Sequence, residues 1–262
     1  MSDVLVRQDG PVLHLTLNRP ARRNPLSLAM VLALREALAA AEGDGQTRVV
    51  VLRGAGGHFC AGGDIADMAA ARARAVEDPE VVVRLSAAFG ELCLAFARTP
   101  LATIGVLEGT VMGGGFGLAC VVDVALAGES VDLRLSETSL GLPPAQIEPF
   151  LLERLGYGET KRLVVTGARI GAAEALRLRL VHEVHPDGGL DAALQRVLAD
   201  ILRCAPGALA TSKALLARSR LREPAQLIPE AAQAFSDAVL GDEGTEGTNA
   251  FLQKRPPRWA PP

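Results

Sequence analysis

Two glycine-rich stretches decide the fold: residues 58–65 read HFCAGGDI, and residues 109–117 read GTVMGGGFG. Each follows an apolar run typical of a buried parallel strand, VVVL at 49–52 and LATIGVL at 101–107. Glycine at a strand end permits positive φ and lets a ligand approach the backbone closely. Neither stretch cleanly matches the dinucleotide-binding spacing, and neither carries a P-loop lysine. Each stretch alone is equally consistent with a tight, closely packed turn.

Strand and helix patterns alternate around these stretches, and a helical tail follows. Val4–Val6 and Val12–Leu17 predict a β-hairpin, and Ser27 predicts the N-cap of a helix that reaches Leu38. Further strands are expected at 48–53, 101–107, 121–127 and 180–185, a mobile helix or loop at 67–80, and helices at 81–97, 148–155, 159–165, 172–179, 189–204, 207–219, 224–240 and 244–253. This order predicts an α/β fold with a parallel sheet and crossover helices.

The bulk composition restricts the partners. The chain has 262 residues, of which 49% are hydrophobic, and its 27 basic and 30 acidic residues leave a net charge of −3. No long basic stretch is present, so nucleic acid and an anionic membrane surface are not expected as partners. Positive charge for a small anionic ligand must then come from a few local Lys and Arg side chains.

Cysteine spacing and the N-terminus predict a cytoplasmic protein. The four cysteines are too far apart for a disulfide framework or a zinc cage, which predicts reduced and mostly buried thiols. The N-terminal MSDVLVRQDG has no apolar run of the kind found in signal peptides, and no segment of about 20 apolar residues could span a bilayer. The four histidines form no cluster by spacing, so no metal is expected. These residues are Cys60, Cys93, Cys120, Cys204, His14, His58, His182 and His185.

Further motifs accompany the two glycine-rich stretches in a fixed order. They are LNRP at 17–20 with NPLS at 24–27, LSE at 135–137 with LG at 140–141, TGA at 166–168, and AFLQKR at 250–255. In this order and spacing the chain resembles the crotonase (enoyl-CoA hydratase/isomerase) superfamily along nearly its whole length. Several separated motifs that agree are far more specific than any one of them.

The resemblance implies an α/β fold of the crotonase type. Its ββα spiral core, with the acyl-CoA site, is expected over residues 1–206. A C-terminal helical region over 207–262 is expected to mediate trimerisation and to complete the CoA site. The implied assembly is a homotrimer or a dimer of trimers, and no cofactor is implied beyond the coenzyme A of the substrate.

The resemblance also implies the catalytic groups. By motif position, the backbone N–H groups of Ala61 and Gly114 are expected to form an oxyanion hole for the thioester oxygen. Addition next to a thioester places negative charge on that oxygen, and fixed N–H dipoles stabilise it without reorganising. Glu137 matches one of the two glutamates of hydratases and is expected to act as general acid and base.

Gly117 occupies the position of the other glutamate, and this is the main departure from the family pattern. A single carboxylate could run a proton shuttle, as in isomerases. Alternatively, the substrate, a bound anion, Gln146 or Glu148 could substitute, or hydratase chemistry could be lost. Two like charges at 4 Å repel by about 4 kcal/mol at an effective dielectric of about 20. Glycine at this position would remove that repulsion and open space for a substrate that carries its own carboxylate.

The segments 113–118, 135–137 and 141–149 resemble the branch that hydrates glutaconyl-type thioesters, 3-methylglutaconyl-CoA or the isohexenylglutaconyl-CoA of acyclic terpene breakdown. Hydration of such a branched, carboxylate-bearing 2-enoyl-CoA is therefore the expected activity. Two alternatives stay open: an enoyl-CoA isomerase or decarboxylase on the same fold, and a non-catalytic scaffold that binds CoA thioesters.

The resemblance finally implies two sets of ligand contacts. Residues expected to contact CoA are Arg22, Arg23, Ala61, Gly63, Ile65, Phe251 and Lys254, the last two often from a neighbouring subunit. Residues expected to line the acyl pocket are Met68, Met112, Phe116 and Leu142. Asp64 and Asp123 are instead expected to accept hydrogen bonds from turn or helix-start N–H groups.

Overall fold

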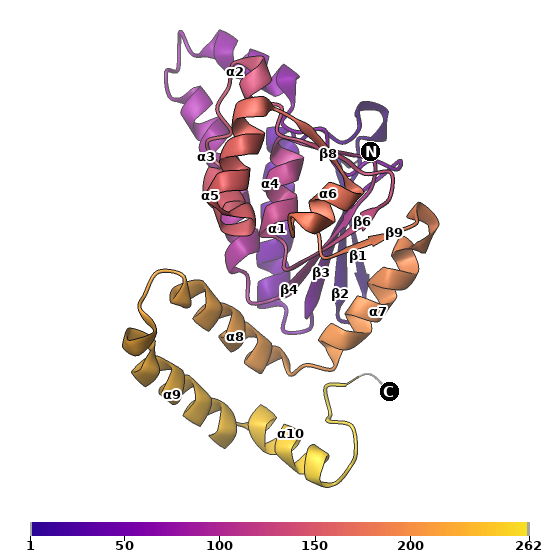
Figure 1. The fold of residues 1–262 in the computed structure, drawn as a ribbon, viewed down its shortest axis with the longest axis vertical. Coiled ribbons are helices and arrows are strands. Elements are labelled where there is room, and N and C mark those ends of the chain that lie inside the picture. Colours follow the sequence, from indigo (N-terminus) through magenta and orange to yellow (C-terminus); the bar gives the residue numbers. More distant parts are fainter. Residues whose placement is uncertain (1, 261–262) are drawn as a thin grey trace. The chain divides into compact units, whose positions relative to one another are not determined.

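The computed structural model describes residues 2–260, and its largest feature is a six-stranded sheet (Figure 1). The order is β1-β2-β3-β4-β6-β9; β1 and β2 form the expected antiparallel hairpin, and β2–β3, β4–β6 and β6–β9 pair in parallel. The strands are β1 (Val4–Asp9), β2 (Val12–Leu17), β3 (Val49–Gly54), β4 (Ala102–Leu107), β6 (Val124–Gly128) and β9 (Glu183–His185). The apolar runs in β3 and β4 are buried because neither face of this part of the sheet meets water.

A second sheet of three short strands was not predicted. It consists of β5 (Thr110–Met112), β7 (Asp132–Arg134) and β8 (Arg169–Gly171). β5 and β7 are parallel, with Met112 opposite Arg134, and an isolated parallel bridge joins Cys60 to Val111. Three-residue strands leave almost no periodic signal in a sequence. This small sheet nevertheless sets the two glycine-rich stretches and residues 135–137 side by side.

Helices supply the remaining elements. Ser27 caps α1 by accepting a hydrogen bond from the Met30 N–H at 3.2 Å, and the buried Met30, Val31, Leu34 and Leu38 form the face that packs on β1 and β2. The helices are α1 (Leu28–Gly43), α2 (Ile65–Arg74), α3 (Val81–Arg98), α4 (Gly114–Val121), α5 (Glu148–Thr166), α6 (Ala172–Arg177), α7 (Leu190–Leu202), α8 (Pro206–Ser219), α9 (Pro224–Leu240) and α10 (Asp242–Leu252).

The chain forms two compact units. One holds the chain up to Ala97 together with Thr103–Leu194, and the other holds Arg98–Ala102 and the chain from Gln195 onward. The second unit therefore begins before the predicted boundary at residue 207. Two contacts within it explain the difference: the Lys213 Nζ donates to the Leu101 carbonyl at 2.6 Å, and the Trp259 indole donates to the Arg203 carbonyl at 3.0 Å.

One local prediction needs correction. Residues 114–121 form the buried helix α4 rather than a turn that leads into a strand, and β6 begins only at Val124. Burial of all eight residues supports this helix, because packing outweighs the poor helix propensity of glycine. The two helices expected over 148–165 are confirmed, because the element labelled α5 is interrupted by a kink at Gly156, whose non-helical φ is 72°. Of the segment expected to be a helix or loop, 67–80, the first part is helical, since α2 extends to Arg74.

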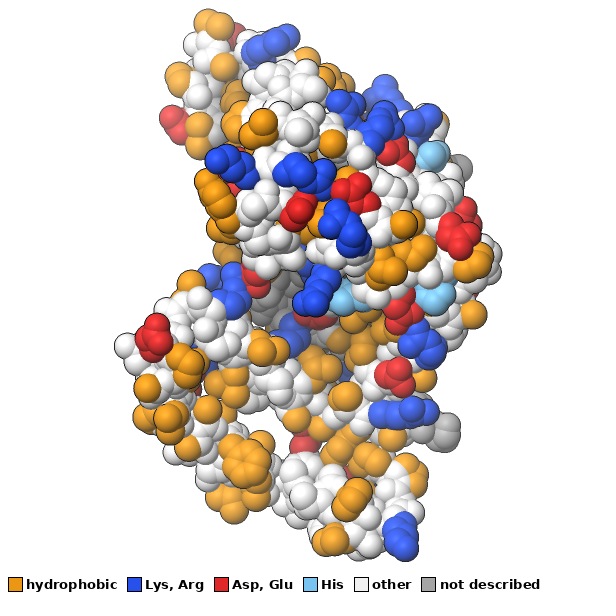
Figure 2. Space-filling model, in the orientation of Figure 1, with side chains coloured by type: hydrophobic (Ala, Val, Ile, Leu, Met, Phe, Trp, Pro, Cys, Tyr) orange, Lys and Arg blue, Asp and Glu red, His pale blue; other side chains and the backbone are white. Residues whose placement is uncertain are grey.

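The exposed side chains of the second unit include many apolar ones. Figure 2 shows hydrophobic side chains gathered over the C-terminal helices. They include Leu216, Leu221, Ile228, Phe235, Leu240, Phe251 and Leu252. Among residues 2–260, no helix is long and apolar enough to cross a membrane.

Candidate active site

Backbone pairing brings three segments of the chain together at one point. The Cys60 N–H donates to the Thr110 carbonyl and the Met112 N–H donates to the Cys60 carbonyl, both at 2.9 Å. The Gly113 N–H then donates to the Arg134 carbonyl at 3.0 Å. The residues that follow these pairs, 61–63, 113–114 and 135–137, must therefore lie next to one another, as neighbouring strands are only about 4.8 Å apart.

Close contacts at two glycines confirm that the three segments meet. Gly62 has a φ of 100°, and a β-carbon there would lie 3.2 Å from the Met112 carbonyl oxygen. Gly113 has a φ of 49°, and a β-carbon there would lie 2.9 Å from Oε1 of Glu137. Both positions require glycine, because positive φ and the missing β-carbon allow this approach. The Glu137 carboxyl thus lies against the second glycine-rich stretch.

Glu137 is half-buried and held by its own loop. Its Oε2 is buried and, among the described residues, has no hydrogen-bond partner. Burial raises the pKa of the Glu137 carboxyl above its ordinary value. The Leu142 N–H donates to the Glu137 carbonyl at 3.0 Å, and the Thr138 hydroxyl donates to the Val164 carbonyl at 2.9 Å, which ties the loop to α5. A carboxyl with a raised pKa and a free oxygen suits proton transfer.

The first expected N–H donor is corrected by the structure. The Ala61 N–H already donates to the Arg23 carbonyl at 2.9 Å, so this group is not available to a ligand here. Leu26 pairs with the same edge of residues 61–64. Its N–H donates to the Gly62 carbonyl, and its carbonyl accepts from the Asp64 N–H. Because extended residues present their N–H groups to alternate edges, the Gly63 N–H lies on the opposite edge from Leu26. Within residues 2–260 it has no acceptor.

The second predicted donor, the Gly114 N–H, stays a prediction. Gly114 is the first residue of α4, and the N–H groups of a first helical turn have no partner within the helix. The helix dipole adds positive potential at this end. Because the segments that carry Gly63, Gly114 and Glu137 are adjacent, we infer that an oxygen between the two glycines would accept from both N–H groups. Gly63, expected only as a CoA contact, therefore replaces Ala61 in the oxyanion hole that we infer.

The position of the missing glutamate is filled rather than open. A β-carbon on Gly117 would lie 2.3 Å from the γ2 methyl of Ile147, a side chain that is 3% exposed. The expectation that glycine opens space here is therefore wrong. Gln146 donates from its Nε2 to the Ser86 hydroxyl at 3.1 Å and packs against Gly90 of α3, while Glu148 is exposed in the first turn of α5. No described contact brings either side chain to Glu137.

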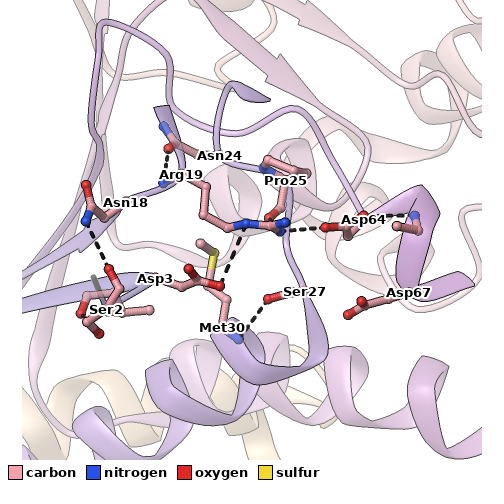
Figure 3. A network of polar contacts seen from close by, with 12 residues as sticks. Ser2, Asp3, Asn18, Arg19, Asn24, Pro25, Ser27, Met30, Asp64 and Asp67 are labelled. Carbon is pink, nitrogen blue, oxygen red and sulfur yellow. Dashed lines mark hydrogen bonds and ion pairs between the residues drawn. The ribbon is translucent and has the colours of Figure 1, made fainter. Parts of the chain in front are cut away.

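A buried asparagine holds the loop that precedes the site (Figure 3). The fully buried Asn24 accepts from the Arg19 N–H at 2.8 Å and donates to the carbonyls of Ala55 and His58 at 2.9 and 2.6 Å. Arg23 and Asn24 both have positive φ, 60° and 57°. Asn24 therefore joins this loop to the start of the first glycine-rich stretch.

Replacing Asn24 with alanine should lower the free energy of unfolding by about 2 kcal/mol or more, because two carbonyls and one N–H lose their buried partner. Denaturant unfolding measures the change. Asn18→Ala is the control: Asn18 donates a single hydrogen bond, to the Ser2 carbonyl at 2.9 Å, at a more exposed position. Equal effects of the two substitutions would contradict the role given to Asn24.

An ion pair fixes the start of α2 beside this loop (Figure 3). The Arg19 guanidinium lies 2.6 Å from the Asp64 carboxylate, which also caps α2 by accepting from the Ala66 N–H at 2.8 Å. Burial alone would raise the pKa of Asp64, but the hydrogen bonds from Arg19 and Ala66 outweigh it and lower the pKa. Asp64 thus has the predicted structural role. Asp123 is also structural, but the N–H from which it accepts, at 2.8 Å, is that of Thr103 in β4 rather than one of a turn or a helix start.

The residues expected to contact CoA fall into two groups. Arg22, Arg23 and Ile65 are exposed near the first glycine-rich stretch, and in the described part of the chain no ion pair engages the two guanidinium groups. Phe251 and Lys254 lie in the second unit; both are exposed, whereas the neighbouring Arg255 is engaged by Glu246 at 2.7 Å. Their predicted contact with CoA stays a prediction.

The predicted acyl-pocket residues are only partly brought together. Met68 reaches the site, because a β-carbon on Gly63 would lie 2.5 Å from its terminal methyl, and the Met112 carbonyl lies beside Gly62. Leu142 is tied to Glu137 by its N–H, but its side chain is 41% exposed. Phe116 is wholly buried in α4, so it belongs to the core in this structure.

The sequence profile of the family described as enoyl-CoA hydratase/isomerase matches residues 7–262. The chain belongs to the enoyl-CoA hydratase/isomerase family. A 2,3-dehydroadipyl-CoA hydratase of Escherichia coli is 34% identical over 262 aligned residues, which cover 98% of each chain. A Δ3,5-Δ2,4-dienoyl-CoA isomerase of Arabidopsis thaliana is 27% identical over 96% of this chain and 94% of its own. The solved structure of Pseudomonas aeruginosa AtuE superposes with a TM-score of 0.96 at 49% identity, covering 99% of this chain and all of that one.

Membership in the enoyl-CoA hydratase/isomerase family confirms the crotonase-type fold with a C-terminal helical region. It also makes the chain an enzyme of the hydratase/isomerase kind that acts on acyl-CoA thioesters. Two site residues escaped the sequence reasoning, namely Gly63 as a donor and Ile147 beside Gly117. Alternation of N–H groups along 60–64 could have suggested the first, whereas no local signal pointed to the second.

Proposed function

We propose that this enzyme hydrates a branched, carboxylate-bearing 2-enoyl-CoA of the isohexenylglutaconyl-CoA or 3-methylglutaconyl-CoA type. One observation carries the proposal: a single half-buried carboxylate, Glu137, lies at the meeting point of the two glycine-rich stretches, and an aliphatic side chain fills the place of a second. A site with one carboxylate repels a substrate carboxylate less than a site with two. The similarity to a hydratase of 2,3-dehydroadipyl-CoA, a thioester of a dicarboxylic acid, supports an acidic acyl group.

In the proposed reaction the thioester oxygen accepts hydrogen bonds from the Gly63 and Gly114 N–H groups. Water adds to the β-carbon while Glu137 takes its proton, and the electron pair of the double bond moves to the thioester oxygen as an enolate. The two N–H dipoles stabilise that charge. Glu137 then returns the proton to the α-carbon, so one group acts first as base and then as acid. Hydration is redox-neutral, and the proposal needs no cofactor beyond the CoA of the substrate.

The proposal includes contacts outside the reacting centre. Arg22 and Arg23 are free to bind CoA phosphates, for which guanidinium groups are well suited. We assign Phe251 and Lys254, contributed by a neighbouring subunit, to contacts with CoA as well. The apolar side chains exposed on the C-terminal helices support a homotrimer or a dimer of trimers, and we place the reaction in the cytoplasm.

Isomerisation is the second candidate. A single carboxylate suffices to move one proton between two carbons, and the similarity to a dienoyl-CoA isomerase favours this chemistry. It would use the same oxyanion hole and the same Glu137. The two reactions differ in whether an oxygen atom from water enters the product.

Turnover of 3-methylglutaconyl-CoA, its isohexenyl analogue and crotonyl-CoA, compared side by side in heavy-oxygen water, tests the proposal. We expect the glutaconyl thioesters to react faster and the label to enter a hydroxyacyl product. Faster turnover of crotonyl-CoA would contradict the acidic substrate. A rearranged product without label would identify an isomerase, and CoA binding without any turnover would identify a scaffold.

A further inference from the structure

The side chain of Ile147 occupies the space that a side chain at residue 117 would need. The γ2 methyl of Ile147 lies 2.3 Å, and its β-carbon 3.1 Å, from the point where a β-carbon of residue 117 would stand. Two groups cannot share this volume. Ile147 belongs to the N-cap of α5, and only 3% of its surface is exposed.

The helix geometry places this pair beside the reacting groups. Gly117 lies one turn after Gly113, to whose carbonyl its N–H donates at 3.0 Å. Side chains of a helix tilt toward its N-terminus, so a side chain at 117 would extend over the turn that contains Gly113 and Gly114. The aliphatic side chain of Ile147 occupies the space of a side chain at residue 117, although Ile147 belongs to a different segment of the chain. The loop that ends at Ile147 begins at Glu137, which connects the acid/base group and this wall through one stretch of chain.

We infer that Ile147 determines specificity: its side chain takes the volume that a side chain at residue 117 would need, and it gives the acyl site a hydrocarbon wall that selects a hydrocarbon substituent on the β-carbon. The inference rests on the proposed function only in that a CoA thioester occupies the site. One helical turn corresponds to about 5.4 Å of rise. The Gly114 N–H binds the thioester oxygen in the proposed reaction. A group about one turn away from it is therefore close enough to contact the β-carbon of the acyl chain and the first substituent on that carbon, but not the far end of the chain.

The affinity of unreactive thioesters tests the selection. Butyryl-CoA is unbranched, isovaleryl-CoA carries one methyl group on the β-carbon, and neither has a double bond to hydrate. We expect the native enzyme to prefer isovaleryl-CoA and Ile147→Ala to reduce that preference by about tenfold, the lower end of what a methylene in a fitted apolar pocket contributes. If Ile147→Ala does not fold, Ile147→Val, which removes one methylene, should reduce it about threefold.

Leu151→Ala is the matched control, because Leu151 is equally buried one turn further along α5. It should weaken packing but keep the preference for the branched thioester. An unchanged preference in the Ile147 variants, with both thioesters still bound, would overturn the inference and leave the proposed function standing. If the native enzyme binds neither thioester, both the inference and the proposed function are overturned.

Thermal unfolding tests the shared volume without any ligand. Gly117→Ala should lower the Tm in the native background and lower it much less in the Ile147→Ala background, because the γ2 methyl that it meets is then absent. Equal effects in the two backgrounds would show that Ile147 does not occupy this place, whatever the substrate is.

Discussion

Replacing Glu137 with glutamine is expected to lower kcat by about 10²–10⁴-fold, because the amide cannot accept and return the proton. Among residues 2–260, no second carboxylate is placed to take over, since Ile147 fills the place beside Gly117 and Glu148 is exposed. KM should change little, because the thioester is held mainly by backbone donors and by contacts to CoA. Steady-state kinetics on the preferred glutaconyl thioester measures both constants.

The stability of the same variant provides the control. Burial raises the pKa of Glu137 in the folded protein, so the folded state binds this proton more tightly than the unfolded state. The contribution of Glu137 to stability is therefore fully present below the ordinary glutamate pKa and is lost as the pH rises through the raised value. Glu137→Gln should consequently be at least as stable as the native enzyme at pH 8. A variant that is inactive but also less stable at pH 8 would contradict this account, and a nearly native rate would refute the acid/base role.

Replacing Gly114 with proline is expected to lower kcat by about 10²–10³-fold, the usual loss when one oxyanion donor is removed. Proline lacks the N–H but is well tolerated at the first position of a helix, which Gly114 occupies in α4. The substitution therefore removes the donor while α4 is retained. Rates with the preferred thioester, together with the helical content by circular dichroism, measure the two effects separately.

Gly114→Ala is the matched control for this substitution. It adds the same β-carbon, which would lie 3.1 Å from the Phe89 ring and 3.2 Å from Leu26, but it keeps the N–H. It should lose far less activity than the proline variant. Similar losses in the two variants would mean that the added carbon, rather than the missing donor, causes the defect.

Much of the architecture could be predicted because its causes are local. The run VVVL in β3 consists only of apolar residues, so its burial is expected whatever its neighbours are. Ser27 caps α1 by accepting from an N–H only three residues away. The helix α4 was missed because glycines favour no element by themselves, and only burial on all sides makes this stretch helical. The small sheet was missed because its strands are too short to show a period.

The order of the motifs was sufficient to predict Glu137 and Gly114 as site residues and to notice that residue 117 is not a glutamate. These predictions require only the residue type at each motif position. The tertiary structure decided which N–H groups are free and what fills the space beside Gly117. The pairing of residues 60–64 with Leu26 and Arg23 engages Ala61 and leaves Gly63, and the approach of α5 to α4 places Ile147 against Gly117. Both depend on segments distant in the chain, because hydrogen bonds and excluded volume act between neighbours in space rather than between neighbours in sequence.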